Sequence, residues 1–74
     1  MSGAVVVATV DRQRAQIILS GRDLVDLVDI AGLAYRTAGS GALVVQLEHL
    51  ADLEVACAIR RRPLRIQSRR EATR

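Results

Sequence analysis

Apolar residues fall in short runs along the chain, and the spacing within each run predicts a particular element. Residues 4–10 and 15–19 are rich in Val, Ile and Leu and flank a polar stretch at residues 11–14. Two such runs around a short polar connection are typical of a hairpin, so they predict a pair of β-strands. Residues 42–46 repeat this composition and predict a third strand.

Residues 21–36 instead show the spacing of an amphipathic helix. At about 100° per residue, one face collects the apolar side chains, namely Leu24, Leu27, Val28, Ala31 and Tyr35. Ser20 and Asp23 have the spacing of a shortened capping box and predict a helix start near Gly21. The Gly-rich residues 37–41 are expected to end the helix as a loop, since the chain has no lysine for a Walker phosphate cradle.

Three carboxylates recur at three-residue intervals along the same helix, at Asp23, Asp26 and Asp29. Carboxylates are ligands for divalent cations, but no His or further acid lies near them in the sequence. Negative charge in the first turn of a helix is favoured by the helix macrodipole. We therefore interpret the three acids as a solvated helix flank that is able to meet a basic partner.

Residues 47–61 fit two periods. A helix gathers most of their apolar residues on one side, namely Leu47, Leu50, Ala51, Leu53, Val55, Cys57 and Ala58. Glu54 is centred on that side and would need a partner, either an arginine across a subunit interface or a functional role as a carboxylate. A strand over residues 52–60 removes this misfit. The abundance of Ala, Leu, Glu and Arg favours the helix, with residues 60–62 at its negative end.

The remaining segments complete the predicted architecture. Pro63 ends the preceding element, and residues 64–67 predict a short edge strand with its apolar side chains turned inward. Residues 68–74 lack apolar content and are expected to form a basic flexible tail beyond a single domain at residues 1–67. The prediction is an α+β fold of order β-β-α-β-α, with the edge strand as a fourth.

Composition narrows the class of protein. A 74-residue chain whose only aromatic residue is a tyrosine builds an aliphatic core that rarely supplies more than about 3–5 kcal/mol alone, so homodimerisation is expected. The start of the chain lacks the pattern of a signal peptide or membrane span, and Cys57 has no second cysteine to pair with, which together predict a cytoplasmic protein. All eleven basic residues are arginine, a composition typical of GC-rich bacterial or phage genomes.

Candidate catalytic chemistry is sparse. His49 and Cys57 are eight residues apart, or about 12 Å along a helix, which is too far for a hydrogen-bonded nucleophile and base. We expect Cys57 to be a small buried hydrophobe and His49 a surface residue. No catalytic set, metal site or cofactor is predicted, so the chain is expected not to be an enzyme.

Charge provides the main functional signal. Residues 1–59 hold four arginines and seven acids, a net charge of −3, whereas residues 60–74 hold seven arginines and one acid, a net charge of +6. We predict that this cluster binds phosphates of DNA or RNA through Arg60, Arg61, Arg62, Arg65, Arg69 and Arg70. The alternative is a protein-binding module, a small inhibitor or adaptor that docks on a host protein through Asp23, Asp26, Asp29 and Glu54.

Overall fold

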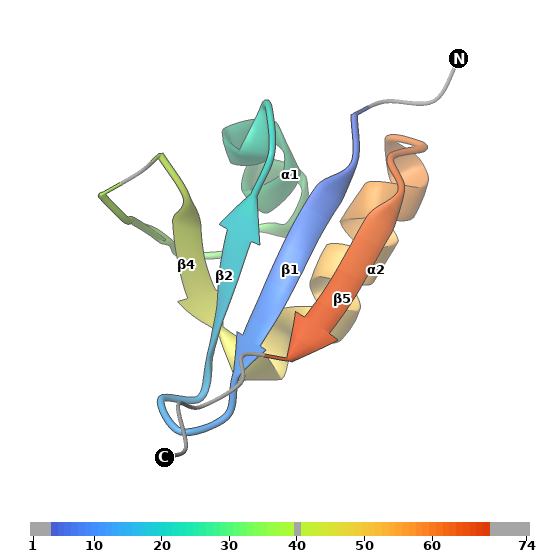
Figure 1. Cartoon of the computed structure of the whole chain (residues 1–74). Helices are drawn as coiled ribbons and strands as arrows, with labels where there is room; N and C mark the ends of the chain where they lie inside the picture. Colours follow the sequence, from blue (N-terminus) through green and yellow to red (C-terminus); the bar gives the residue numbers. More distant parts are fainter. Residues whose placement is uncertain (1–3, 40, 69–74) are drawn as a thin grey trace.

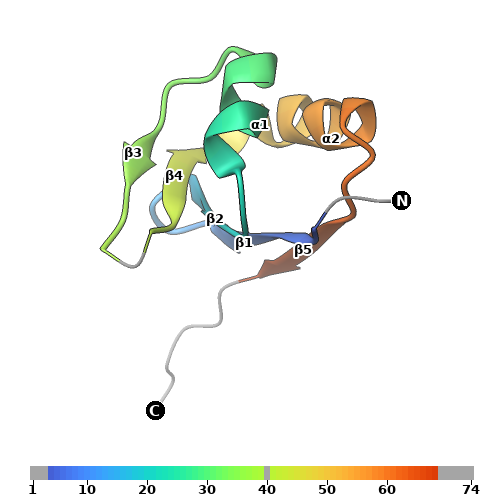
Figure 2. The ribbon, with the colours of Figure 1, turned by 90° about the horizontal axis from the view of Figure 1, so that it is seen from above.

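The computed structural model describes residues 4–39 and 41–68, which form a mixed sheet with two helices on one of its faces (Figures 1 and 2). The predicted α+β class is confirmed. The elements in chain order are β1 (Val6–Asp11), β2 (Gln16–Ser20), α1 (Leu24–Ala31), β3 (Arg36–Thr37), β4 (Leu43–Gln46), the short 3-10 helix η1 (Leu47–His49), α2 (Leu50–Ile59) and β5 (Leu64–Ser68).

The five strands lie in the order β3-β4-β2-β1-β5. The predicted hairpin is β1 and β2, which pair in antiparallel register with Val10 opposite Ile17. β5 pairs with β1 in parallel, and the Val6 N–H donates to the Pro63 carbonyl oxygen at 2.9 Å where the two strands begin. The predicted edge strand is therefore confirmed, and it extends to Ser68, one residue further than expected.

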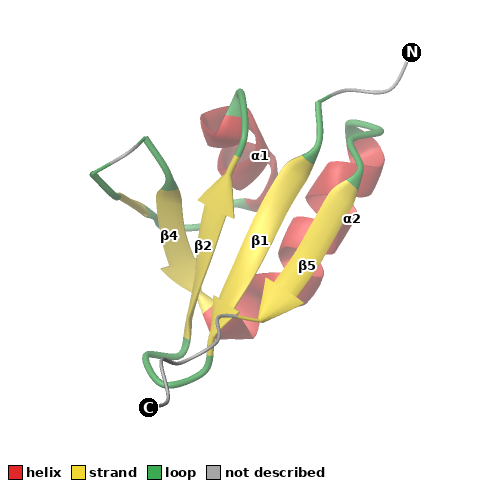
Figure 3. Ribbon diagram, viewed as in Figure 1, coloured by secondary structure: helices red, strands yellow, loops and turns green. Residues whose placement is uncertain are grey.

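The core lies between the sheet and the helices, which Figure 3 shows behind the strands. Alternate residues of the central strands face the helices and are buried, such as Val6 and Ala8 on β1 and Ile17 and Leu19 on β2. The residues between them point to the opposite face of the sheet. Neither α1 nor α2 covers that face (Figure 2). The largest fully buried side chains are all aliphatic, in agreement with the composition.

Helix α1 is shorter than the helix predicted over residues 21–36. It begins at Leu24, because Asp23 takes a left-handed conformation with φ 54° and makes no side-chain capping bond, so the predicted capping box is absent. It ends at Gly32, whose N–H donates to the Asp29 carbonyl oxygen at 3.1 Å. This Schellman-type end redirects the chain, and Tyr35 lies outside the helix and 39% exposed rather than on its apolar face.

Residues 47–59 are helical and residues 60 and 61 form a turn, which decides between the two readings of this pattern. Helix α2 buries Leu53, Ala56 and Cys57. It is rotated relative to the predicted apolar side, because Val55 is 60% exposed and Glu54 is also exposed. Apolar residues occur around most of this helix, so their spacing does not select a face. The small side chains of Ala56 and Cys57 allow α2 to approach the sheet and α1 closely.

Candidate functional site

The three consecutive arginines after α2 have different environments. The Arg60 Nε lies 3.0 Å from the Asp26 Oδ2, an ion pair that links α2 to α1. The Arg62 Nε donates to the Ala4 carbonyl oxygen at 3.0 Å, and its Nη1 donates to the Asp23 carbonyl oxygen at 3.2 Å. Two of the predicted phosphate ligands thus already make contacts within the chain.

The other predicted phosphate ligands are arranged differently. Arg61 is exposed and adopts a left-handed backbone conformation with φ 55°. Arg65 on β5 lies opposite Val7 on β1 and projects from the face of the sheet that the helices leave uncovered. Arg69 and Arg70 lie outside the described residues. The basic cluster in the sequence is therefore divided in space between the α2–β5 loop and the sheet.

We use the term open face for the uncovered side of the sheet. Its middle row runs across all five strands in register, from Arg36 on β3 through Val44, Ile18 and Thr9 to Gln67 on β5. The Gln67 Nε2 donates to the Thr9 Oγ1 at 3.0 Å. Half-buried β-branched side chains occupy the centre of this row, and its β3 end is an arginine.

Further arginines surround the open face. Arg12 and Arg14 are exposed in the turn between β1 and β2. Ser68, the last residue of β5, pairs with Val10 just before that turn. β5 therefore ends beside the turn between β1 and β2 (Figure 1). The sequence alone did not associate Arg12, Arg14 and Arg36 with the C-terminal cluster, because 24 or more residues separate each of them from Arg60.

Acidic side chains lie on the other side of the molecule. The exposed acids among the described residues belong to the two helices and the residues that lead into them: Asp23, Asp26, Asp29, Glu48, Asp52 and Glu54. The remaining described acid, Asp11, is only 6% exposed, and its Oδ1 accepts from the Arg14 backbone N–H at 3.3 Å. Asp26 and Asp29 are exposed on α1 and Asp23 is exposed just before it, as predicted. The exposed acids of the described residues lie away from the open face, except Glu48 at its margin.

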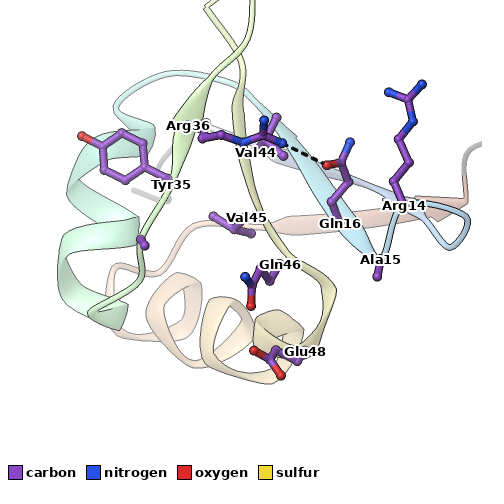
Figure 4. A pocket seen from close by; sticks show the side chains of 10 residues that line it. Arg14, Ala15, Gln16, Tyr35, Arg36, Val44, Val45, Gln46 and Glu48 are labelled. Atoms are coloured by element: carbon purple, nitrogen blue, oxygen red, sulfur yellow. Dashed lines mark hydrogen bonds between the residues drawn. The ribbon is translucent and has the colours of Figure 1, made fainter.

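An open pocket of about 590 Å³ lies where the β3–β4 pairing ends (Figure 4). β3 pairs only with Leu43 and Val44, so the chain before Arg36 diverges from the rest of β4. The Arg36 Nη2 donates to the Gln16 Oε1 at 3.2 Å across one side of the pocket. Arg14, Gln46 and Glu48 also line it. The pocket is thus a recess of mixed, mainly apolar lining, with the side chains of Arg14 and Arg36 at the margin of the open face.

Catalytic groups do not converge on these surfaces. Cys57 is 2% exposed, and burial raises the pKa of its thiol, an effect that the nearby Arg62 guanidinium partly offsets. The His49 Nδ1 lies 3.4 Å from the Asp52 Oδ2 and its Nε2 lies 3.5 Å from the Glu48 Oε2, both on the helical side. Within residues 4–39 and 41–68, no three His, Cys, Asp or Glu residues are grouped in a way that would hold a metal ion.

The described part of the chain also contains no helix that is long and apolar enough to cross a bilayer. Neither protein families, curated proteins nor solved structures give a match to this chain.

Proposed function

We propose that this protein is a small, non-enzymatic, self-associating module that binds nucleic acid through the phosphate backbone. The observation that carries the proposal is the separation of charge between the two sides of the fold. Arg36 and Arg65 flank an open face whose only acid, Asp11, is buried, while the exposed acids of the described residues lie with the helices. A polyanion approaching the open face meets guanidinium groups and few carboxylates, with Glu48 at the margin.

The chemistry of the open face fits backbone contact more closely than base recognition. Arginine forms bidentate, charge-assisted bonds to phosphate oxygens and remains charged throughout the physiological pH range. The rows of the open face contain Val, Ile, Thr, Ser, Gln, Arg and the buried Asp11 but no aromatic side chain on which a base would stack. Binding is therefore expected to depend strongly on salt and weakly on sequence.

The turn and the C-terminal segment extend this surface in our proposal. Arg12 and Arg14 lie at the end of the sheet where β5 ends at Ser68. Arg69 and Arg70 follow Ser68 directly in the sequence and belong to the proposed phosphate ligands outside the described residues. The contribution of Arg60 and Arg62 is smaller in this proposal, because their guanidinium groups bind Asp26 and two backbone carbonyls. A homodimer would carry two such surfaces.

The proposal is tested by binding of a labelled random duplex over a series of salt concentrations. Replacing Arg36 and Arg65 together by alanine should weaken binding and lower the log–log salt slope by about 2, because each lost phosphate contact contributes about 0.9. The matched control replaces Arg22 and Arg61, which are exposed in the loops before α1 and after α2, and removes the same charge. We expect this control to keep most of the wild-type affinity.

Two results would contradict the open face as the binding surface. One is the absence of duplex binding by the intact chain near physiological salt. The other is an equal loss of affinity in both double variants, which would move the contact toward the loop after α2. A chain that ends at Ser68 measures the C-terminal arginines separately. This end point retains β5, whereas a chain that ends at Ile59 would remove an entire strand from the sheet.

The alternative, a protein-binding module, is favoured by the same separation of charge. The acidic side of the helices would meet a basic partner through Asp23, Asp29 and Glu54, while Asp26 is already paired with Arg60. Changing Asp29 and Glu54 to Asn and Gln should leave duplex binding intact or strengthen it if the polyanion proposal holds. Unchanged duplex binding with loss of a captured protein partner would assign these acids to protein recognition.

A further inference from the structure

The outer side of α2 is unusually apolar for a solvent-facing helix. Val55 and Ile59 are 60% and 61% exposed. Ala51 and Ala58 are also exposed and fall on the same side at about 100° per residue. We call these four residues the α2 stripe. It extends over about 12 Å of helix, from residue 51 to residue 59, on the surface opposite Leu53 and Cys57.

The charges at the two ends of α2 are opposite and suit a second copy of the same helix. Glu48 and Asp52 lie just before or within its first turn, and Arg61 follows its last turn, while Glu54 lies at the middle of the helix. Two parallel copies would place like charges side by side. Two antiparallel copies would place the acidic end of each helix beside the basic end of the other, with opposed macrodipoles. Ala51 and Ala58 leave room for the two helices to approach closely.

We propose that the α2 stripe is the contact surface between two copies of this chain, paired antiparallel about a two-fold axis near Val55. In this arrangement Ala51 of one copy lies beside Ile59 of the other, and the contact is the same from both sides. The inference rests on the self-association in our proposed function and gives it a surface. It also has a consequence for binding, because the open faces lie on the sides of the two sheets remote from α2 (Figure 2). A dimer formed in this way presents two basic faces directed away from its own interface.

The first test is the oligomeric state of the intact chain by sedimentation velocity over a wide range of concentrations. Wild type should sediment with twice the mass of one chain, and Val55→Glu should sediment as a monomer, because a carboxylate on the axis is desolvated next to its own copy. Val25→Glu is the matched control, since Val25 is also a helical valine and is 47% exposed on α1. This variant should remain dimeric.

The pairing direction is tested by cross-linking of cysteine variants. Ala51→Cys and Ile59→Cys, mixed before oxidation, should form a 51–59 disulfide in preference to either homodisulfide, because antiparallel pairing brings only the unlike positions within disulfide reach. The native Cys57 is 2% exposed and should not compete. Homodisulfides at 51 and at 59 as the main products would overturn the antiparallel arrangement.

Failure of this inference is distinguishable from failure of the proposed function. A wild-type chain that stays monomeric at all concentrations, or a Val25→Glu chain that dissociates as readily as Val55→Glu, overturns the α2 interface regardless of any duplex binding. If the inference holds, the monomeric Val55→Glu chain keeps a far-UV circular dichroism spectrum like wild type and loses bridging between an immobilised and a labelled duplex. Persistence of bridging by this monomer would also contradict the inference.

Discussion

Replacing Arg62 by alanine removes two charge-assisted hydrogen bonds that join three segments of the chain. The guanidinium donates to the carbonyl oxygens of Ala4, which precedes β1, and of Asp23, which precedes α1. Asp23 is held in a left-handed conformation with φ 54°, and the bond to its carbonyl oxygen is one of the contacts that fix this entry to the helix. Loss of Arg62 should therefore loosen the starts of β1 and α1 together.

The magnitude follows from the bonds and their surroundings. A hydrogen bond to a charged group contributes about 1.5–3 kcal/mol where it is protected from water. The bonds of 3.0 and 3.2 Å lie near the surface, where water replaces them in part. The Nη2 of Arg62 is buried and has no hydrogen-bond partner among the described residues. This unsatisfied group lowers the stability of the wild-type chain and so reduces the net loss on substitution. We expect Arg62→Ala to lower the free energy of unfolding by about 2 kcal/mol and Tm by about 10 °C.

Arg61→Ala is the matched control, because the same residue type is removed one position earlier. Arg61 is exposed, and the structure gives its side chain no partner within the described residues, so the change should stay within about 0.5 kcal/mol. Arg60→Ala loses an ion pair whose side chains are 50% and 51% exposed, which costs less than about 1 kcal/mol. Urea unfolding followed by circular dichroism measures all three. Equal midpoints for Arg62→Ala and Arg61→Ala would refute the anchoring role of Arg62.

Two further predictions concern the backbone and the thiol. A Cβ at Gly21 would lie 2.9 Å from the Val5 carbonyl oxygen with φ at 138°, whereas at Gly32 it meets no atom within 4 Å with φ at 70°. Gly32→Ala should therefore cost about 1–2 kcal/mol and Gly21→Ala clearly more; similar Tm values for the two variants would contradict the close approach. Burial raises the pKa of Cys57 above its ordinary value of 9.0. The protonated thiol is favoured in the folded state, so this contribution to stability is complete below pH 9.0 and is lost as pH rises through the raised pKa. Wild type should accordingly lose stability above that pH relative to Cys57→Ala in parallel urea titrations, and parallel pH profiles would contradict this linkage.

The candidate site was only partly visible in the sequence. The run from Arg60 to Arg62 appears as one positive cluster, yet Arg60 and Arg62 bind Asp26 and the backbone near Asp23. These partners lie more than 30 residues away along the chain, so no local pattern connects them. Arg36 was assigned to the end of a helix, and pairing of β3 with β4 moved it to the open face.

Local physical chemistry determined the element types of this protein. The β-branched alternation of β1 and β2 and the glycine after α1 specify conformations through neighbouring atoms alone, and both act within a few residues. The preference of Ala, Leu and Glu for helix likewise outweighed the strand reading of residues 52–60. The aliphatic core followed directly from a composition with a single aromatic side chain.

Tertiary structure decided which faces of those elements meet. α2 is apolar around most of its circumference, so contact with the sheet and α1 selected Ala56 and Cys57 for burial and left Val55 and Ile59 in solvent. The separation of exposed acids from the open face arose in the same way, because strand order and helix placement combine residues that are distant in the chain. Periodicity specifies how residues share a face within one element, whereas burial of apolar area across elements determines where that face points.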